Sequence, residues 1–205
     1  MVRKITYALI LCIVAVATGV LHAQILPLKE LDTTRVFSNI QEAMQNPAEV
    51  IRLDLSKQKL MEFPVAVFEF PNLQELRLNK CRLQELPDRF NEIPLLQRLA
   101  CDHNDIDSIP SSLFRLKHLN SLSLADNVIE IIPDDIDRLN QLETLALWDN
   151  PITYYPERLT EMQHLKVMDV LNNAMSRETQ ERLKMGLPKC KIIMSPPCAC
   201  MDGDE

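Results

Sequence analysis

The chain has 205 residues, a formal net charge of −7 and only three glycines, and this length is typical of one or two domains. Loops that cradle phosphate groups depend on the backbone freedom of glycine, so we expect no nucleotide binding. Nucleic-acid-binding proteins usually present a basic surface. The acidic balance therefore argues against that class as well.

The first 23 residues differ in kind from the rest of the chain. Arg3 and Lys4 precede an apolar run from Ile5 to Leu21, and Ala23 closes the segment. This pattern predicts a secretory signal peptide over residues 1–23, and hence an exported protein: periplasmic, on the cell surface or secreted. The alternative is an uncleaved anchor, which would be the chain's only contact with a membrane. The apolar run is short for a span of about 20 residues, which favours cleavage.

Residues 24–48 are expected to form a lead and a short capping helix. The lead, residues 24–34, is polar and contains proline, so we expect it to be extended and poorly ordered. Ser38 followed by Gln41 matches a capping box at a helix start. Such a helix would cover the open end of a stack of repeats, whose first unit otherwise exposes its core.

A repeat begins at about residue 49 and continues to residue 175, with about five and a half copies. Alternate leucines, as in LNSLSL from Leu119, predict a short strand with leucines facing inward and the residues between them facing outward. The second half of each copy has apolar residues at three-residue intervals after a proline, which predicts short helical turns. These prolines recur at intervals of 23 residues: Pro64, Pro87, Pro110, Pro133 and Pro156.

The pattern resembles the leucine-rich repeat family in its short 23-residue form, over residues 49–194. The resemblance implies an α/β solenoid: a curved arc with a parallel sheet on the concave face, short helical or 3₁₀ segments on the convex face, and helical caps at both ends. An asparagine recurs where the chain leaves each strand, and its amide can satisfy backbone groups in the turn. We expect a structural ladder of Asn104, Asn127, Asn150 and Asn173, with Cys81 in the same column.

The repeat pattern ends at residue 175, and residues 176–194 are expected to form a closing cap. Ser176 is a helix N-cap candidate, and Gly186 marks the end of that helix. An edge strand should follow, and then an acidic, flexible tail over residues 195–205. Because export permits disulfides, we expect Cys190 to pair with Cys198 or Cys200. Cys81 and Cys101 are expected to be small buried residues.

The outward residues of the strands divide into two halves. In the N-terminal half, charges alternate between neighbours, as at Arg52, Glu75 and Arg98, which predicts a solvated, self-paired face. In the C-terminal half, apolar and small residues adjoin one another. An exposed tryptophan among small residues is typical of a binding hot spot, although Trp148 could instead pack against Leu171 or the closing cap. The predicted ligand-binding residues are Trp148, Leu171, Ala125, Ser123, Ala146, Asp126 and Asp149.

No residue pattern indicates catalysis, a cofactor or a metal. The spacing of the following residues matches no metal-ligand motif, and they are better explained as an acidic rim: Asp102, His103, Asp105, Asp126 and Asp149. The family resemblance implies a non-catalytic interaction module that binds a protein or peptide on its concave face. The alternative is a self-associating structural component of the cell envelope, through the same residues or the edge strand at Ile192 and Ile193. The absence of a multi-cysteine cap is more typical of bacterial than of animal proteins.

Overall fold

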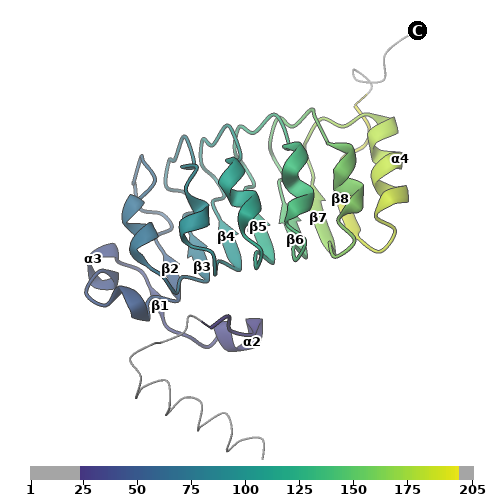
Figure 1. The fold of residues 1–205 in the computed structure, drawn as a ribbon. Helices are drawn as coiled ribbons and strands as arrows, with labels where there is room; N and C mark the ends of the chain where they lie inside the picture. The colour runs from purple at the N-terminus through teal and green to yellow at the C-terminus, as the bar shows by residue number, and fades with distance from the viewer. Residues whose placement is uncertain (1–23, 199–205) are drawn as a thin grey trace, which may run out of the picture.

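Eight parallel strands form one sheet whose strand order follows the chain (Figure 1). The computed structural model describes residues 24–198. The inward leucines of neighbouring repeats lie opposite one another, from Leu53 and Leu76 to Leu122 and Leu145. The predicted parallel sheet is therefore confirmed. Its strands are β1 (Val36–Phe37), β2 (Arg52–Asp54), β3 (Glu75–Arg77), β4 (Arg98–Ala100), β5 (Ser121–Ser123), β6 (Thr144–Ala146), β7 (Val167–Val170) and β8 (Lys191–Met194).

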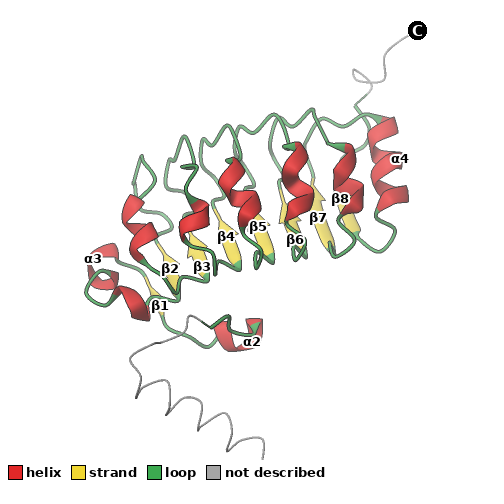
Figure 2. Ribbon diagram, in the orientation of Figure 1, coloured by secondary structure: helices red, strands yellow, loops and turns green. Residues whose placement is uncertain are grey.

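Short 3₁₀ helices line the other side of the sheet (Figure 2). Four of them begin directly after a proline, whose missing N–H costs nothing at a helix start. After Pro87 the helix starts three residues later, at Phe90. Each helix from η2 to η6 places one fully buried apolar residue against the strand leucines, and these residues form one core with them: Val67, Phe90, Leu113, Ile136 and Leu159. The helices are η1 (Pro47–Glu49), η2 (Val65–Glu69), η3 (Phe90–Glu92), η4 (Ser111–Arg115), η5 (Asp134–Arg138) and η6 (Glu157–Glu161).

The asparagine column connects successive repeats through buried side-chain hydrogen bonds. Asn127 shows the pattern: its amide nitrogen donates to the carbonyl of Cys101 at 3.1 Å, and its amide oxygen accepts from the N–H of Ile106 at 3.0 Å. Asn104, Asn150 and Asn173 make the equivalent bonds. Cys81 replaces only the donor, with its sulfur 3.2 Å from the carbonyl oxygen of Leu55.

Two α-helices lie at the ends of the stack. α3 (Ile40–Ala43) is capped by Asn39, whose side chain accepts from the N–H of Glu42 at 3.0 Å. The prediction of Ser38 as N-cap is wrong, since the helix begins one residue later. Ser38 directly follows β1, and its carbonyl oxygen accepts a hydrogen bond from the Gln58 side chain. α4 (Arg177–Gly186) begins at the predicted Ser176, whose hydroxyl accepts from the N–H of Thr179.

The lead folds back over the sheet, so the prediction of an extended, poorly ordered segment is wrong. We call residues 24–34 the strap. It contains the short helix α2 (Leu28–Leu31), which lies apart from the row of 3₁₀ helices in Figure 1. Leu31 is fully buried. Gln74 accepts from the N–H of Leu26 at 2.9 Å, and Gln97 donates to the Leu26 carbonyl at 2.8 Å.

The disulfide expected at Cys190 is not formed. Cys190 carries a free thiol because its side chain packs against the core beside β8. Cys198 is disulfide-bonded, while Cys200 lies outside the described residues. Cys81 and Cys101 are free and buried, as predicted.

No helix within residues 24–198 combines the length and the apolar character needed to cross a membrane. The predicted signal peptide lies outside the described residues.

Candidate functional site

The strap contacts the concave face at the N-terminal ends of β2 to β4, whereas Arg77 at the other end of β3 keeps a side chain that is 43% exposed. Arg52 and Glu75 pair with each other as predicted, but they are only 8% and 2% exposed, so the prediction that they are solvated is wrong. Their ion pair closes with 3.0 Å between Nε and Oε2. The remaining Arg52 donor binds the carbonyl oxygens of Asp32 and Thr34 in the strap. The strap has therefore taken this charge pair out of water.

Arg98 holds the strap at a second point. Its guanidinium donates to the Asp32 carboxylate, and this hydrogen bond keeps the pKa of Asp32 below its ordinary value. Arg98 also lies 3.3 Å from the Glu75 carboxylate. The strap contacts thus extend from β2 to β4. Among the described residues, the strap makes no such contact with the concave face from β5 onward.

The surface from β5 to β7 carries the predicted binding residues except one. Ser123, Ala146 and Trp148 are partly exposed, and Leu171 is 39% exposed. Ala125 is fully buried, so it is not available to a ligand. Its N–H donates to the carboxylate of Asp102 at 2.9 Å, which draws the chain inward directly after β5.

Trp148 stands beside a histidine. The rings of Trp148 and His103 meet edge to face, with 5.7 Å between their centroids. The other side of the histidine contacts the carboxylate of Asp126. The indole therefore has one polar neighbour and a partly exposed surface, which is an arrangement suited to contact with an added apolar group.

Carboxylates gather at the turn that follows each of the middle strands. His103, Asp126 and Asp149 all have a left-handed backbone, with φ of 56°, 51° and 53°. This conformation is uncommon outside glycine, although aspartate adopts it more readily than most residues. The repeated turn fixes where these side chains begin, and Asp149 also accepts from the Asn172 amide at 2.7 Å. The result is a preformed acidic rim beside Trp148.

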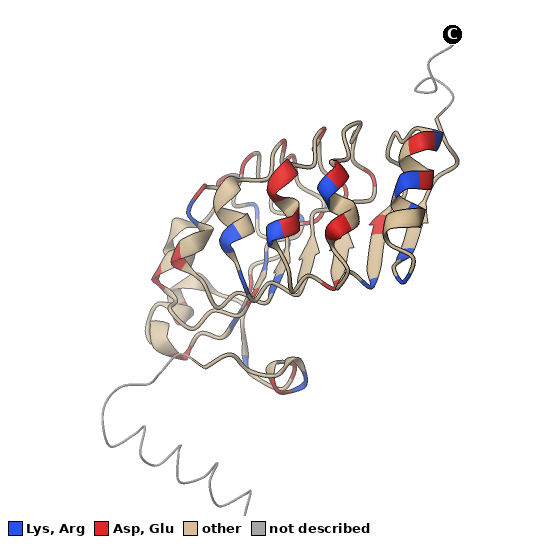
Figure 3. Ribbon diagram, turned by 45° about the vertical axis from the view of Figure 1, so that its right-hand side comes forward, with Lys and Arg blue, Asp and Glu red and all other residues tan. Residues whose placement is uncertain are grey.

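Within residues 24–198, no three His, Cys, Asp or Glu residues are grouped so that they could hold a metal ion. Asp102 already accepts two hydrogen bonds, from Ser123 and from the Ala125 N–H. The convex helices carry interspersed acidic and basic residues (Figure 3), in contrast to the acidic turns.

A second apolar surface lies outside the concave face, and sequence reasoning missed it. Val128, Ile131 and Tyr154 are 47%, 55% and 46% exposed; we call these three residues the lateral patch. They follow β5 and β6, in the loops that lead to the 3₁₀ helices. The sequence did contain a signal for this patch. Ile131 and Tyr154 occupy the same position of successive repeats, and the earlier repeats carry polar residues there: Glu62, Glu85 and Ser108.

Solved structures with a similar fold come from bacteria and plants. A leucine-rich repeat protein of Leptospira interrogans matches with a TM-score of 0.66 and 23% identity, over 80% of this chain and 49% of that one. Internalin C2 of Listeria monocytogenes matches with a TM-score of 0.65 and 22% identity, over 74% and 64%. The ectodomain of the Arabidopsis thaliana receptor kinase GASSHO1/SCHENGEN3, in complex with CASPARIAN STRIP INTEGRITY FACTOR 2, matches with a TM-score of 0.58 and 20% identity, over 81% and 23%.

The chain spans less than two thirds of each of these proteins, and at such identities the likeness shows the fold alone. A search of curated proteins gave no match. A family model described as a leucine-rich repeat region matches residues 65–195, which is more than half of the chain. Together with the 23-residue period and the single parallel sheet, this match shows that the chain belongs to the leucine-rich repeat family.

Proposed function

We propose that this protein is an exported, non-catalytic module that binds a protein or peptide on the C-terminal half of its concave face. The observation that carries the proposal is the position of Trp148, the only tryptophan of the chain. It is partly exposed on the half of the sheet that the strap leaves open. Tryptophan at the centre of such a surface is the residue type most enriched in binding hot spots.

The neighbours of Trp148 define the ligand that would fit. Leu171 offers further apolar area, while Ser123 and Ala146 are small enough to let a ligand approach the sheet. Asp126 and Asp149 supply acceptors at the rim. The surface therefore suits an apolar group flanked by cationic or hydrogen-bond-donating groups.

Two observations support export. The pattern of residues 1–23 is that of a secretory signal peptide. The similar structures include internalins and the ectodomain of a plant membrane receptor. The receptor ectodomain was solved in complex with a partner, which is consistent with ligand binding by this fold.

The proposal is tested by capture of partners from the native cell surface with immobilised wild type and a Trp148→Ala variant. The variant should lose the captured protein while its circular dichroism and melting temperature stay unchanged. Met185→Ala is the matched control, since Met185 is 77% exposed on α4 and away from the concave face. Equal capture by wild type and Trp148→Ala would show that the concave surface is not the binding site.

Self-association is a second candidate, favoured by the position of β8. β8 is the last strand of the sheet, and such an edge presents backbone groups that can pair with another strand. Ile192 and Ile193 are partly exposed there. Sedimentation of the purified chain separates the two candidates: a dimer that an Ile193→Lys change dissolves supports self-association, and a monomer at high concentration counts against it.

A further inference from the structure

The lateral patch is held in a fixed arrangement by backbone hydrogen bonds. Ile131 and Tyr154 form a parallel bridge between the two loops. The N–H of Thr153 donates to the Glu130 carbonyl at 3.0 Å, and the N–H of Ile132 donates to the Tyr154 carbonyl at 3.2 Å. An apolar surface that is organised before binding loses little conformational entropy when a partner docks.

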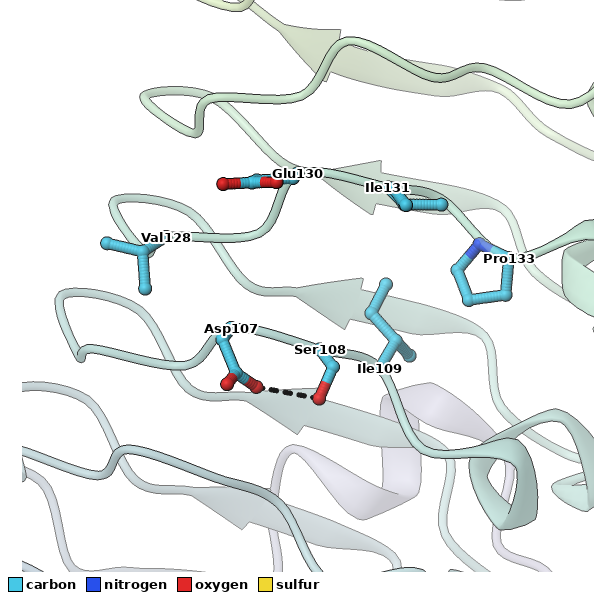
Figure 4. Close-up of a pocket in the computed structure, with 7 residues that line it drawn as sticks. All are labelled: Asp107, Ser108, Ile109, Val128, Glu130, Ile131 and Pro133. Atoms are coloured by element: carbon cyan, nitrogen blue, oxygen red, sulfur yellow. Dashed lines mark hydrogen bonds between the residues drawn. The ribbon is translucent and has the colours of Figure 1, made fainter.

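An open depression adjoins the patch on its N-terminal side. Its volume is about 540 Å³, and it lies between the loop after β4 and the loop after β5. Figure 4 shows Ile109 pointing across this space toward Ile131 and Pro133, with Val128 at the far end. The depression offers an apolar floor for a side chain from outside, directly beside the exposed face of Ile131.

Both charged residues that line the depression are acidic, whereas Arg158 and Arg182 line a second hollow next to Asp134 and Tyr154. Asp107 and Glu130 line the depression, and Asp134 lies beside the patch, where its carboxylate accepts from the Tyr154 hydroxyl at 2.9 Å. Asp105 precedes the same wall. Among residues 24–198, none of these four carboxylates forms an ion pair.

This charge decides between the possible occupants. A second copy docked depression to depression would bring Asp107 and Glu130 of both copies close together, which is unfavourable. The tail of this chain carries Asp202, Asp204 and Glu205, so it is repelled for the same reason. A cationic segment meets no such repulsion, and apolar side chains within it can cover the patch.

We propose that the lateral patch is a docking site for a segment of another protein in which an aliphatic side chain is flanked by lysine or arginine. The aliphatic side chain enters the depression against Ile109 and Ile131. The flanking cations lie near Asp107 and Glu130, the two carboxylates that line the depression. This site is separate from the concave surface around Trp148, and it does not depend on the function proposed for that surface.

The test uses the full chain and fluorescein-labelled synthetic peptides. The probe is GRKIKRG, and GRKSKRG has the same charge without the aliphatic side chain. Fluorescence anisotropy should show at least tenfold weaker binding of the serine peptide, because serine offers little apolar surface to the depression. A tenfold loss of affinity corresponds to about 1.4 kcal/mol. A Val128→Ser, Ile131→Ser double variant should lose about tenfold in affinity for GRKIKRG, and a Glu130→Gln variant should weaken its dependence on salt.

Val65→Ser is the matched control, because Val65 is 61% exposed on η2 and outside the patch. It should bind GRKIKRG as wild type does, and so should Trp148→Ala, which separates this proposal from the concave one. Equal binding of the two peptides would reduce the effect to general charge attraction and overturn the proposal. A wild-type dimer in sedimentation that the Val128→Ser, Ile131→Ser variant dissolves would overturn it too, because the occupant would then be a second copy.

Discussion

Replacing Asn127 by alanine should destabilise the protein through one unsatisfied backbone group. The Asn127 side chain donates to the carbonyl oxygens of Cys101, Leu124 and Ala125. Each of these carbonyls keeps a second donor in the variant, from Asn104, Asn150 and the N–H of His103 respectively. The N–H of Ile106, in contrast, has the Asn127 amide oxygen as its one partner within residues 24–198.

The cost follows from this difference. A buried donor left without a partner costs about 1–3 kcal/mol, and each shared hydrogen bond contributes less than about 1 kcal/mol. Asn127→Ala should therefore lower the free energy of unfolding by about 2–4 kcal/mol. Cys81→Ala removes only a weak thiol donor from a carbonyl that also accepts from the N–H of Gln58, so its cost should stay near or below about 1 kcal/mol.

Urea unfolding followed by circular dichroism measures both variants. Val128→Ala serves as the control, because this exposed neighbour should change the midpoint little. Equal destabilisation by Asn127→Ala and Cys81→Ala would refute the reasoning. The hydrogen bond from the Ile106 N–H to the Asn127 amide oxygen would then contribute nothing to the free energy of unfolding. A loss below about 0.5 kcal/mol for Asn127→Ala would refute it as well, given the expected cost of an orphaned donor.

Three further outcomes are expected. The Arg98 hydrogen bond lowers the pKa of Asp32. The stability that Asp32 gives is therefore present above its unfolded pKa of about 3.9 and is lost as pH falls through the lowered folded value. The difference in melting temperature between wild type and Asp32→Asn should shrink over that range. A thiol reagent should modify the partly exposed Cys190 in the native protein well before the buried Cys81 and Cys101, whose labelling should require unfolding. Gly186→Ala should destabilise the chain by about 1–3 kcal/mol in urea unfolding, because an added Cβ would lie 2.4 Å from Cβ of Thr160; an unchanged midpoint would show that η6 yields at that contact.

The repeat frame could be predicted because it depends on period alone. A 23-residue interval fixes which residues face inward, and stacking fixes the register of every strand. The exposure of Ala125 could not be read in the same way. Alternation between the two faces holds only while the chain is a strand, and β5 ends at Ser123. At Ala125 the Asp102 carboxylate, not the pleat, sets the direction of the chain.

The strap escaped prediction because its contacts have no periodic signal. Gln74 and Gln97 are ordinary polar residues in the sequence, and their partners lie 48 and 71 positions away. The alternating charges of Arg52, Glu75 and Arg98 correctly indicated pairing between strands. Their burial depends on whether the strap covers them, which no local pattern states.

The strap also gives this stack a property that a simple array of repeats lacks. In a solenoid each repeat contacts only its neighbours, so unfolding can begin at either end and proceed one unit at a time. The strap joins the segment before the first repeat to Gln97 and Arg98 in β4. The N-terminal end can therefore fray only if contacts reaching β4 are broken, whereas β8 at the other end has no such tie among the described residues. We therefore expect β1 to β4 to open together as one unit rather than repeat by repeat.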